Sequence, residues 1–240
     1  PDSVTSIGMG AFQHCSNLES ITIPDSVTSI DEYTFSWCSS LTNVTIGSGV
    51  TSIGSGAFGN CDSLTNVTIP DNVTYIGDWL FEYCYNLKGV TIPDSVTYIG
   101  SYMFQYCSSL ESIIIPDSIT SIGTVMFRNC ENLTNVTISD SVNFISSDAF
   151  NGCINLKYNE DDNKLYLGNE DNPYLVLVKV KDQSITSCEI NSKTKIILYG
   201  AFQLCESLKY NEYDNGYYLG NEDNPYLVLV KVKDTSITSC

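Results

Sequence analysis

The residues with the greatest chemical potential in this 240-residue sequence are its cysteines, of which there are ten. Seven of them recur at intervals of 23 residues, namely Cys15, Cys38, Cys61, Cys84, Cys107, Cys130 and Cys153. Such a series could form disulfides or bind metal ions. Equivalent side chains of stacked repeats point in parallel, however, so their Cβ atoms would stay about 4.8 Å apart, farther than a disulfide prefers. Because no Cys-x-x-Cys pair brings sulfur atoms together, we expect buried free thiols and no metal centre.

Aspartates form a second series, which a serine at position 48 interrupts. Its members are Asp2, Asp25, Asp71, Asp94, Asp117 and Asp140. Stacked carboxylates could bind calcium, but the sequence has no Asp-x-Asp-x-Asp-Gly loop, and the capping of turn amides explains the residue type. The clusters Glu160-Asp161-Asp162 and Glu170-Asp171 leave two alternatives open, weak metal binding and solvated turns.

Catalysis has no support in the sequence. The single histidine, His14, stands where other repeats carry Trp37, Tyr83 and Tyr106, which indicates a variable surface residue rather than a catalytic base. No repeat departs from the pattern to bring a nucleophile, a base and an orienting acid together. We therefore predict that the protein is not an enzyme and that it has no catalytic residues and no cofactor.

These residues belong to a 23-residue unit that reads P-D-S-V-T-S-I-G-x-x-A-F-x-x-C-x-x-L-x-x-V-T-I. Phenylalanines keep the same interval at Phe12, Phe35, Phe58, Phe81, Phe104, Phe127 and Phe150. Burying the apolar side chains of one unit contributes about 1.5–3 kcal/mol each, whereas ordering its backbone costs about 1–2 kcal/mol per residue. One unit alone is therefore unstable, and the repeat predicts a solenoid whose coils bury one another's faces.

Within one unit the pattern predicts four segments. Residues 90–92 alternate apolar and polar side chains and form a short strand. Residues 93–95 form a proline turn, and residues 96–99 form a second extended stretch. Gly100 then opens a short helical or 3₁₀ segment that reaches Cys107. The fold class is therefore an α/β solenoid with parallel strands about 4.8 Å apart.

Two insertions interrupt the repeat at residues 157–184 and 209–236. Each carries a Leu-Gly-Asn-Glu-Asp-Asn-Pro turn between apolar runs, which predicts a β-hairpin. Beyond the first one, Ile185, Cys188 and Ile190 resume the register of the strand. We expect one solenoid domain over residues 1–240, a fragment that is open at both ends.

The charge of the chain excludes several partners. It has 28 acidic and 11 basic residues and a formal net charge of −17, which argues against nucleic acid and anionic membranes. Residues 1–156 hold 15 acidic and 2 basic side chains, so an electrostatically steered partner would be basic and would dock there. No apolar run approaches the ~18 residues of a membrane span.

Aromatic residues gather at positions that the core does not require, because other repeats carry Gly56 and Asn60 there. The candidate binding residues are Trp79, Tyr83, Tyr102, Tyr106, Tyr75, Tyr98, Tyr33 and Trp37. The first four should form one exposed patch of the kind that marks contact sites, and packing between neighbouring coils is the alternative. A second surface is a row of outward strand residues, which Ile114 interrupts: Thr22, Thr45, Thr68, Thr91 and Thr137.

The pattern Leu18-x-x-Ile21-x-Ile23 resembles the strand of a leucine-rich repeat, although the usual asparagine that follows is replaced by Pro-Asp-Ser. The A-F-x-x-C-x-x-L and I-P-D-S-V-T-S-I-G elements, with the Y-L-G-N-E-D-N-P-Y-L-V-L-V insertion, are similar to the Treponema-type repeats of the Bacteroides surface protein A-like (BspA-like) family. The resemblance implies a leucine-rich repeat array and a secreted or surface protein that adheres to host proteins or cells.

The leading hypothesis is therefore a non-enzymatic, extracellular or cell-surface protein that mediates protein–protein or cell adhesion. Its partner would be a protein, such as a host extracellular-matrix or cell-surface protein, or a glycan, and this segment would not insert into a membrane. The alternative hypothesis is a structural spacer that presents another domain.

Overall fold

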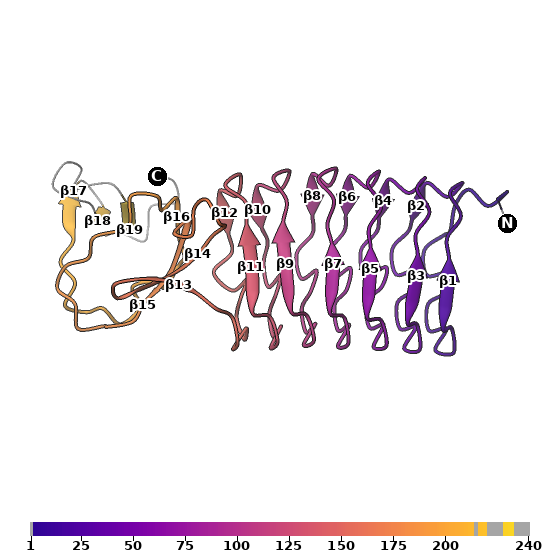
Figure 1. Ribbon diagram of the computed structural model, residues 1–240, viewed down its shortest axis with the longest axis horizontal. Coiled ribbons are helices and arrows are strands. Elements are labelled where there is room, and N and C mark those ends of the chain that lie inside the picture. The colour runs from indigo at the N-terminus through magenta and orange to yellow at the C-terminus, as the bar shows by residue number, and fades with distance from the viewer. Residues whose placement is uncertain (1, 214–215, 220–227, 233–240) are drawn as a thin grey trace.

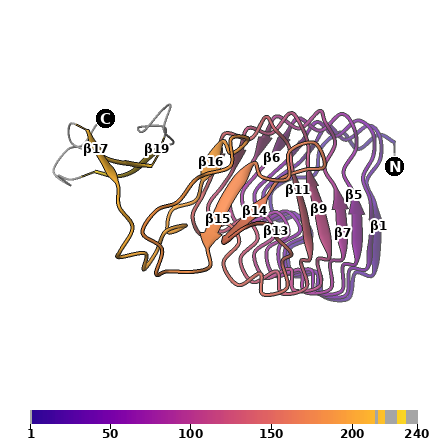
Figure 2. The same cartoon turned by 60° about the vertical axis from the view of Figure 1, so that its left-hand side comes forward.

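The computed structural model describes residues 2–213, 216–219 and 228–232. Its coils stack along the long axis of the molecule and carry two rows of short strands (Figure 1). One row holds β1 (Ser20–Thr22), β3 (Asn43–Thr45), β5 (Asn66–Thr68), β7 (Gly89–Thr91), β9 (Ser112–Ile115) and β11 (Asn135–Ile138). The other row holds β2 (Ser29–Ile30), β4 (Ser52–Ile53), β6 (Tyr75–Ile76), β8 (Tyr98–Ile99), β10 (Ser121–Ile122) and β12 (Phe144–Ile145). Figure 2 shows the first row lying along one face of the stack.

Strands of successive coils pair in parallel, in the register that the repeat predicts. Ile21 pairs with Val44, and Val67 with Val90, each 23 residues further along the chain. In β3 and β5 the apolar middle residue is buried while its neighbours are exposed. The parallel solenoid predicted from the 23-residue unit is therefore confirmed.

The interior is a column of stacked phenylalanines. The ring centroids of Phe58 and Phe81 are 5.9 Å apart, and those of Phe81 and Phe104 are 5.8 Å apart. The five rings from Phe35 to Phe127 are completely buried. Offset stacking of this kind adds about 0.5–1.5 kcal/mol per pair to the burial of the rings. Like residues 23 apart therefore lie over one another throughout the regular coils.

The cysteines line the same interior as free thiols. Six of the seven are buried, and Cys15 in the first coil is exposed. Each buried thiol donates a hydrogen bond to a phenylalanine carbonyl of the preceding coil, as from Cys107 Sγ to Phe81 O at 3.1 Å. Burial raises the pKa of Cys38 to about 11 and that of Cys84 to about 12. The thiols thus act as hydrogen-bond donors between coils as well as small apolar side chains.

The prediction of a helical or 3₁₀ segment in each coil is wrong, since the described residues contain strands and turns but no helix. Residues 100–107 instead form consecutive turns whose amide groups alternate in direction. The N–H groups of Tyr102, Phe104 and Tyr106 donate to the next coil, at 2.8–3.0 Å, while that of Cys107 donates to Phe104 O within the coil. A helix would use all of these donors internally and would leave the coils without this second set of bonds.

The first insertion forms an antiparallel hairpin of β14 (Lys164–Leu167) and β15 (Val176–Val180), as predicted. An additional strand, β13 (Asn159–Asp161), pairs with β14, and β15 pairs in parallel with β16 (Ile196–Ile197). Residues 185–190 form no strand, so the expected return to the strand register there is wrong. The strand position next to β11 is instead taken by Gly168, which bridges to Thr137.

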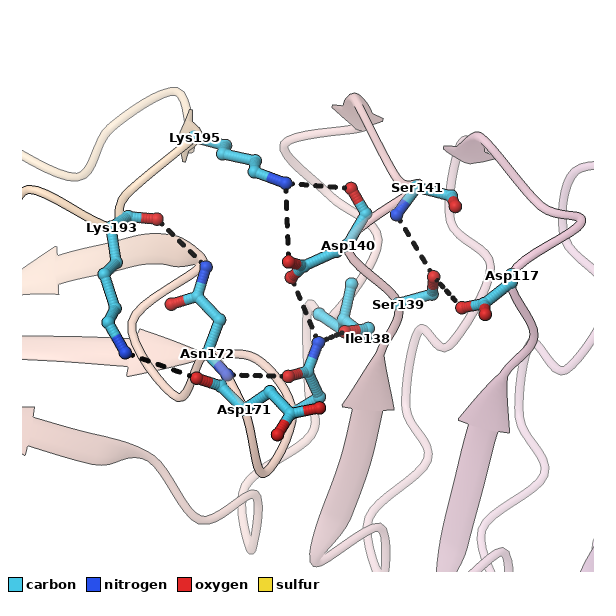
Figure 3. Close-up of polar contacts among 10 residues, drawn as sticks. Asp117, Ile138, Ser139, Asp140, Ser141, Asp171, Asn172, Lys193 and Lys195 are labelled. Atoms are coloured by element: carbon cyan, nitrogen blue, oxygen red, sulfur yellow. Dashed lines mark hydrogen bonds and ion pairs between the residues drawn. The ribbon is translucent and has the colours of Figure 1, made fainter.

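Polar contacts hold this insertion against the last regular coils (Figure 3). The Nδ2 of Asn169 donates to the carbonyl of Ile138 at 2.9 Å and to Asp140 Oδ1 at 3.2 Å. Lys195 Nζ lies 3.5 Å from Asp140 Oδ2 and forms an ion pair with it. The second insertion contains β17 (Asn211–Tyr213), β18 (Gly216–Leu219) and β19 (Val228–Val232), and the rest of residues 209–236 lies outside the described residues.

Candidate functional site

Six of the eight candidate aromatic residues share an unusual backbone conformation. Their φ angles lie between 56° and 65°, in the left-handed region, at Tyr33, Trp37, Trp79, Tyr83, Tyr102 and Tyr106. This region costs an L-residue roughly 1–2 kcal/mol, and glycine and asparagine adopt it most readily. Other coils indeed place Gly56, Asn60 and Asn129 at the equivalent positions. The fold therefore needs the conformation but not the aromatic side chains.

Stacking between coils partly offsets this backbone strain. The rings of Tyr83 and Tyr106 lie 4.8 Å apart, and those of Trp79 and Tyr102 lie 5.7 Å apart. A stacked pair contributes about 0.5–1.5 kcal/mol, which is comparable to the strain at one of its two residues. These four side chains are half-buried. They therefore pack between neighbouring coils and still present part of their surface to solvent.

The remaining candidates are more exposed. Tyr75 and Tyr98 lie on β6 and β8 with stacked rings 5.1 Å apart, and Tyr98 is 51% exposed. Trp37 is also 51% exposed and stacks on His14 at 5.8 Å. His14 lies on the surface of the first coil. The structure thus brings the aromatic candidates into stacked pairs along the array.

Sequence reasoning missed one aromatic neighbour of this surface. Tyr85 is exposed, and its ring lies 6.1 Å from that of Tyr83. The signal was present in the sequence, because the equivalent positions in other repeats carry small polar residues such as Asp62 and Ser108. A third tyrosine therefore extends the pair formed by Tyr83 and Tyr106.

A carboxylate lies among the aromatic rings. Glu82 is half-buried between Trp79 and Tyr83 in sequence, and burial raises its pKa. Burial also raises the pKa of the Tyr83 hydroxyl, and the charge of Glu82 adds to that effect. The three ion pairs found among the described residues all lie between positions 140 and 195. Glu82 thus carries its charge without a cationic side chain against it.

The threonine row lies on the solvent side of the strands, as expected. Thr22, Thr45, Thr68 and Thr91 are exposed, and Ile114 in the same row is 67% exposed. A hollow of about 470 Å³ lies over β5, β7 and β9, where Gly89 has no side chain. The sheet face is therefore hydroxyl-rich and flat except at this position.

The aspartate series caps turns. Asp25 accepts hydrogen bonds from the amide and the hydroxyl of Ser48 in the next coil, at 2.7 and 3.1 Å. In the first acidic cluster, Glu160 pairs with Lys181 at 2.8 Å. Within the described residues, no three histidine, cysteine, aspartate or glutamate side chains gather closely enough to hold a metal ion. The described segments also contain no helix of the length and hydropathy that a membrane crossing requires.

Comparison with known proteins places these features in context. The family model described as "BspA type Leucine rich repeat region" matches residues 1–107 and 28–157, with 6 copies. A leucine-rich repeat protein of T. pallidum is 30% identical with a TM-score of 0.62, over 64% of this chain and 72% of that chain. No match is found among curated proteins.

Two further solved structures are similar over more of the chain. A leucine-rich repeat protein of Bacteroides ovatus is 26% identical with a TM-score of 0.48, over 91% of this chain and 66% of that chain. The pneumococcal vaccine antigen PcpA is 23% identical with a TM-score of 0.50, over 86% of this chain. The matched region spans 49% of that antigen, and the similarity to it concerns the fold.

Proposed function

The chain belongs to the BspA-type leucine-rich repeat family, and we propose that it is a surface or secreted adhesion protein. Proteins with these repeats are generally interaction or surface proteins rather than enzymes. The role proposed for this chain is to bind a host extracellular-matrix or cell-surface protein. The binding surface would be the stacked aromatic residues around Trp79, Tyr83, Tyr102 and Tyr106.

One observation carries this proposal. The aromatic side chains occupy left-handed positions where Gly56, Asn60 and Asn129 serve the fold equally well. Their rings lie partly in solvent and are not members of the buried core. Partly exposed tyrosine and tryptophan clusters are typical of the energetic centres of protein interfaces. A surface role accounts for retaining large side chains at positions that strain them.

A protein partner fits this surface better than a glycan. The surrounding coils are strongly acidic, because residues 1–156 contain only Lys88 and Arg128 as basic residues. A basic protein surface would meet both the rings and the carboxylates, whereas a neutral glycan would meet the rings alone.

The test measures binding to a panel of purified extracellular-matrix and cell-surface proteins and to a glycan array. The variant carries Trp79→Asn, Tyr83→Asn, Tyr102→Asn and Tyr106→Asn, since asparagine is compatible with the left-handed conformation. The matched control is Tyr199→Asn, which removes a tyrosine that is 90% exposed elsewhere. We expect a protein ligand whose affinity falls at least about tenfold in the fourfold variant, with no change in the control.

A structural spacer is the second candidate function. The continuous phenylalanine stack and the extended shape of the array favour it (Figure 1). A spacer would bind nothing in the panel, or would bind its ligand equally well after the fourfold replacement. Binding to glycans alone would contradict the choice of a protein partner.

A further inference from the structure

One coil in the aromatic region lacks surface side chains. Gly56 and Gly59 occupy the positions where the preceding coil carries Tyr33 and Ser36. The following coil carries Trp79 and Glu82 at the same two positions. The missing side chains leave a hollow of about 220 Å³, which we call the glycine notch.

Aromatic rings form the two walls of the glycine notch. The ring of Tyr33 leans over Gly56, so that a Cβ atom at position 56 would lie 2.7 Å from its Cδ1 atom. On the other side, one face of Trp79 is covered by Tyr102 in the following coil. Because Tyr102 lies away from the notch, the face of Trp79 that lines the notch has no ring stacked on it. The notch is thus one coil wide and bounded by two π-surfaces.

The notch also contains a carboxylate that has no cation beside it. Glu82 lines the hollow and is half-buried. No ion pair in the described part of the chain includes it. Keeping a partly desolvated carboxylate without a counter-charge is unfavourable, and an incoming cation would remove that penalty.

A neighbouring hollow over the same coil has the same character. It measures about 310 Å³, contains Gly54, and is lined by Asp31, Glu32 and Tyr75. No lysine or arginine lines either hollow. The acidic surface therefore continues along the coil beyond the glycine notch.

We propose that the glycine notch binds an arginine side chain presented by a protein partner. A guanidinium group is flat, stacks on aromatic faces, and pairs with a carboxylate through two parallel hydrogen bonds. A lysine ammonium is compact and strongly hydrated, so it would use the carboxylate but little of the two walls. The inference rests on the proposed protein-binding function and specifies the chemistry of one contact.

The experiment titrates the 240-residue chain with the tripeptide acetyl-Gly-Arg-Gly-amide and follows backbone amide and tryptophan indole signals by NMR. Saturable shifts are expected at Gly56, Gly59 and the indole of Trp79. The indole of Trp37, which stacks on His14 instead, is the internal reference. The corresponding citrulline peptide, which keeps the shape and lacks the charge, should cause no saturable shift. Equal affinity for the lysine peptide would overturn the choice of arginine.

Two variants test the contacts. Glu82→Gln removes the charge and should raise the dissociation constant of the arginine peptide at least about fivefold. Gly56→Tyr fills the notch with the residue that Tyr33 and Tyr102 place in the same conformation, and should abolish the shifts. Asn129→Tyr adds a tyrosine at another left-handed position and leaves the notch open, so it should bind like the unmodified chain. Unchanged binding in both Glu82→Gln and Gly56→Tyr would overturn the proposal.

The outcome is separable from that of the proposed function. A chain that captures a protein from the panel but ignores the arginine peptide would retain the adhesion role and lose the notch. A chain whose notch binds the peptide but that captures no protein would retain the notch and lose the adhesion role.

Discussion

The Sγ atom of Cys84 donates a hydrogen bond to the backbone carbonyl oxygen of Phe58 across 3.1 Å. The same carbonyl position recurs in every regular coil, from Cys38 with Phe12 to Cys153 with Phe127. The contact joins residues 26 positions apart, so it links one coil to the next at the centre of the core. It also explains why a cysteine fits here, since the thiol is small, apolar and able to donate.

Thiol reactivity should divide the series. We expect iodoacetamide at pH 8 to modify Cys15, which is exposed, while the buried thiols from Cys38 to Cys153 stay unmodified. Burial raises the pKa of the Cys84 thiol to about 12, so its reactive thiolate is scarce at that pH. Peptide mass spectrometry after alkylation, with and without urea, measures this. Modification of Cys84 in the folded protein at the rate of Cys15 would contradict the structure.

Stability should fall at alkaline pH. Below pH 9 the thiols are protonated in both the folded and the unfolded chain, so they do not alter the free energy of unfolding. Above pH 9 the unfolded chain releases protons that Cys84 retains in the folded state up to about pH 12, and unfolding becomes more favourable. Each such thiol contributes a slope of roughly 1.4 kcal/mol per pH unit.

Urea unfolding between pH 8 and pH 10.5 measures this slope, and Cys84→Ala is the matched variant. The variant should be less stable at pH 8, because it lacks the packing and the hydrogen bond of the thiol. Its stability should then decline less steeply with pH than that of the unmodified chain. Equal slopes would mean that the thiol titrates alike in both states.

Removing one ring from the phenylalanine column should be strongly destabilising. Phe81→Ala should lower the free energy of unfolding by about 3–5 kcal/mol, because Phe81 is completely buried between Phe58 and Phe104. Phe144→Ala is the control, since that ring is 57% exposed on β12 and should change stability by less than about 1 kcal/mol. Equal losses in the two variants would place Phe81 outside the core.

The interior of this fold was predictable because the repeat length and the strand register are the same number. Once Phe81 and Phe104 are known to lie 23 residues apart, stacking follows from coil geometry. The turn segment was harder, because tyrosine and tryptophan rarely adopt positive φ. The useful signal was the mixture of side chains at equivalent positions. A column that accepts Gly56 and Trp79 alike indicates a left-handed backbone more than a helix.

The insertion shows a different limit. Its hairpin was visible from the turn and the apolar runs, but its attachment was not. The repeat predicts a strand beside β11 from residues near Cys188, whereas Gly168 at the end of β14 takes that place. Periodicity cannot anticipate this, because an antiparallel insertion brings its own backbone donors and acceptors to an open strand edge.

The backbone strain at the aromatic surface predicts opposite effects for two substitutions of Trp37. Trp37→Asn should leave the free energy of unfolding within about 0.5 kcal/mol, because asparagine tolerates φ near 65° and the lost stacking involves only the exposed His14. Trp37→Val should cost about 1–2 kcal/mol, since a β-branched residue is poorly suited to that conformation. Thermal unfolding of the two variants compares them directly, and equal stabilities would show that φ at this position relaxes freely.

The attachment of the first insertion should depend on Asn169. Its side-chain Nδ2 donates to the Ile138 carbonyl and to Asp140, and its Oδ1 accepts from the amide of Asn172 at 2.7 Å. Asn169→Ala therefore leaves a carbonyl and an amide without their partners, at a cost of about 1–3 kcal/mol to the docking of the insertion.

Native-state hydrogen exchange measures this loss locally. Amide protection should fall across β14 and β15, while that of Phe81 and Phe104 in the regular coils stays unchanged, because those coils do not contact Asn169. Asn163→Ala is the control, since its side chain bonds Asp182 within the insertion and does not reach β11. Uniform loss of protection along the whole chain would instead indicate that the insertion and the coils unfold as one cooperative unit.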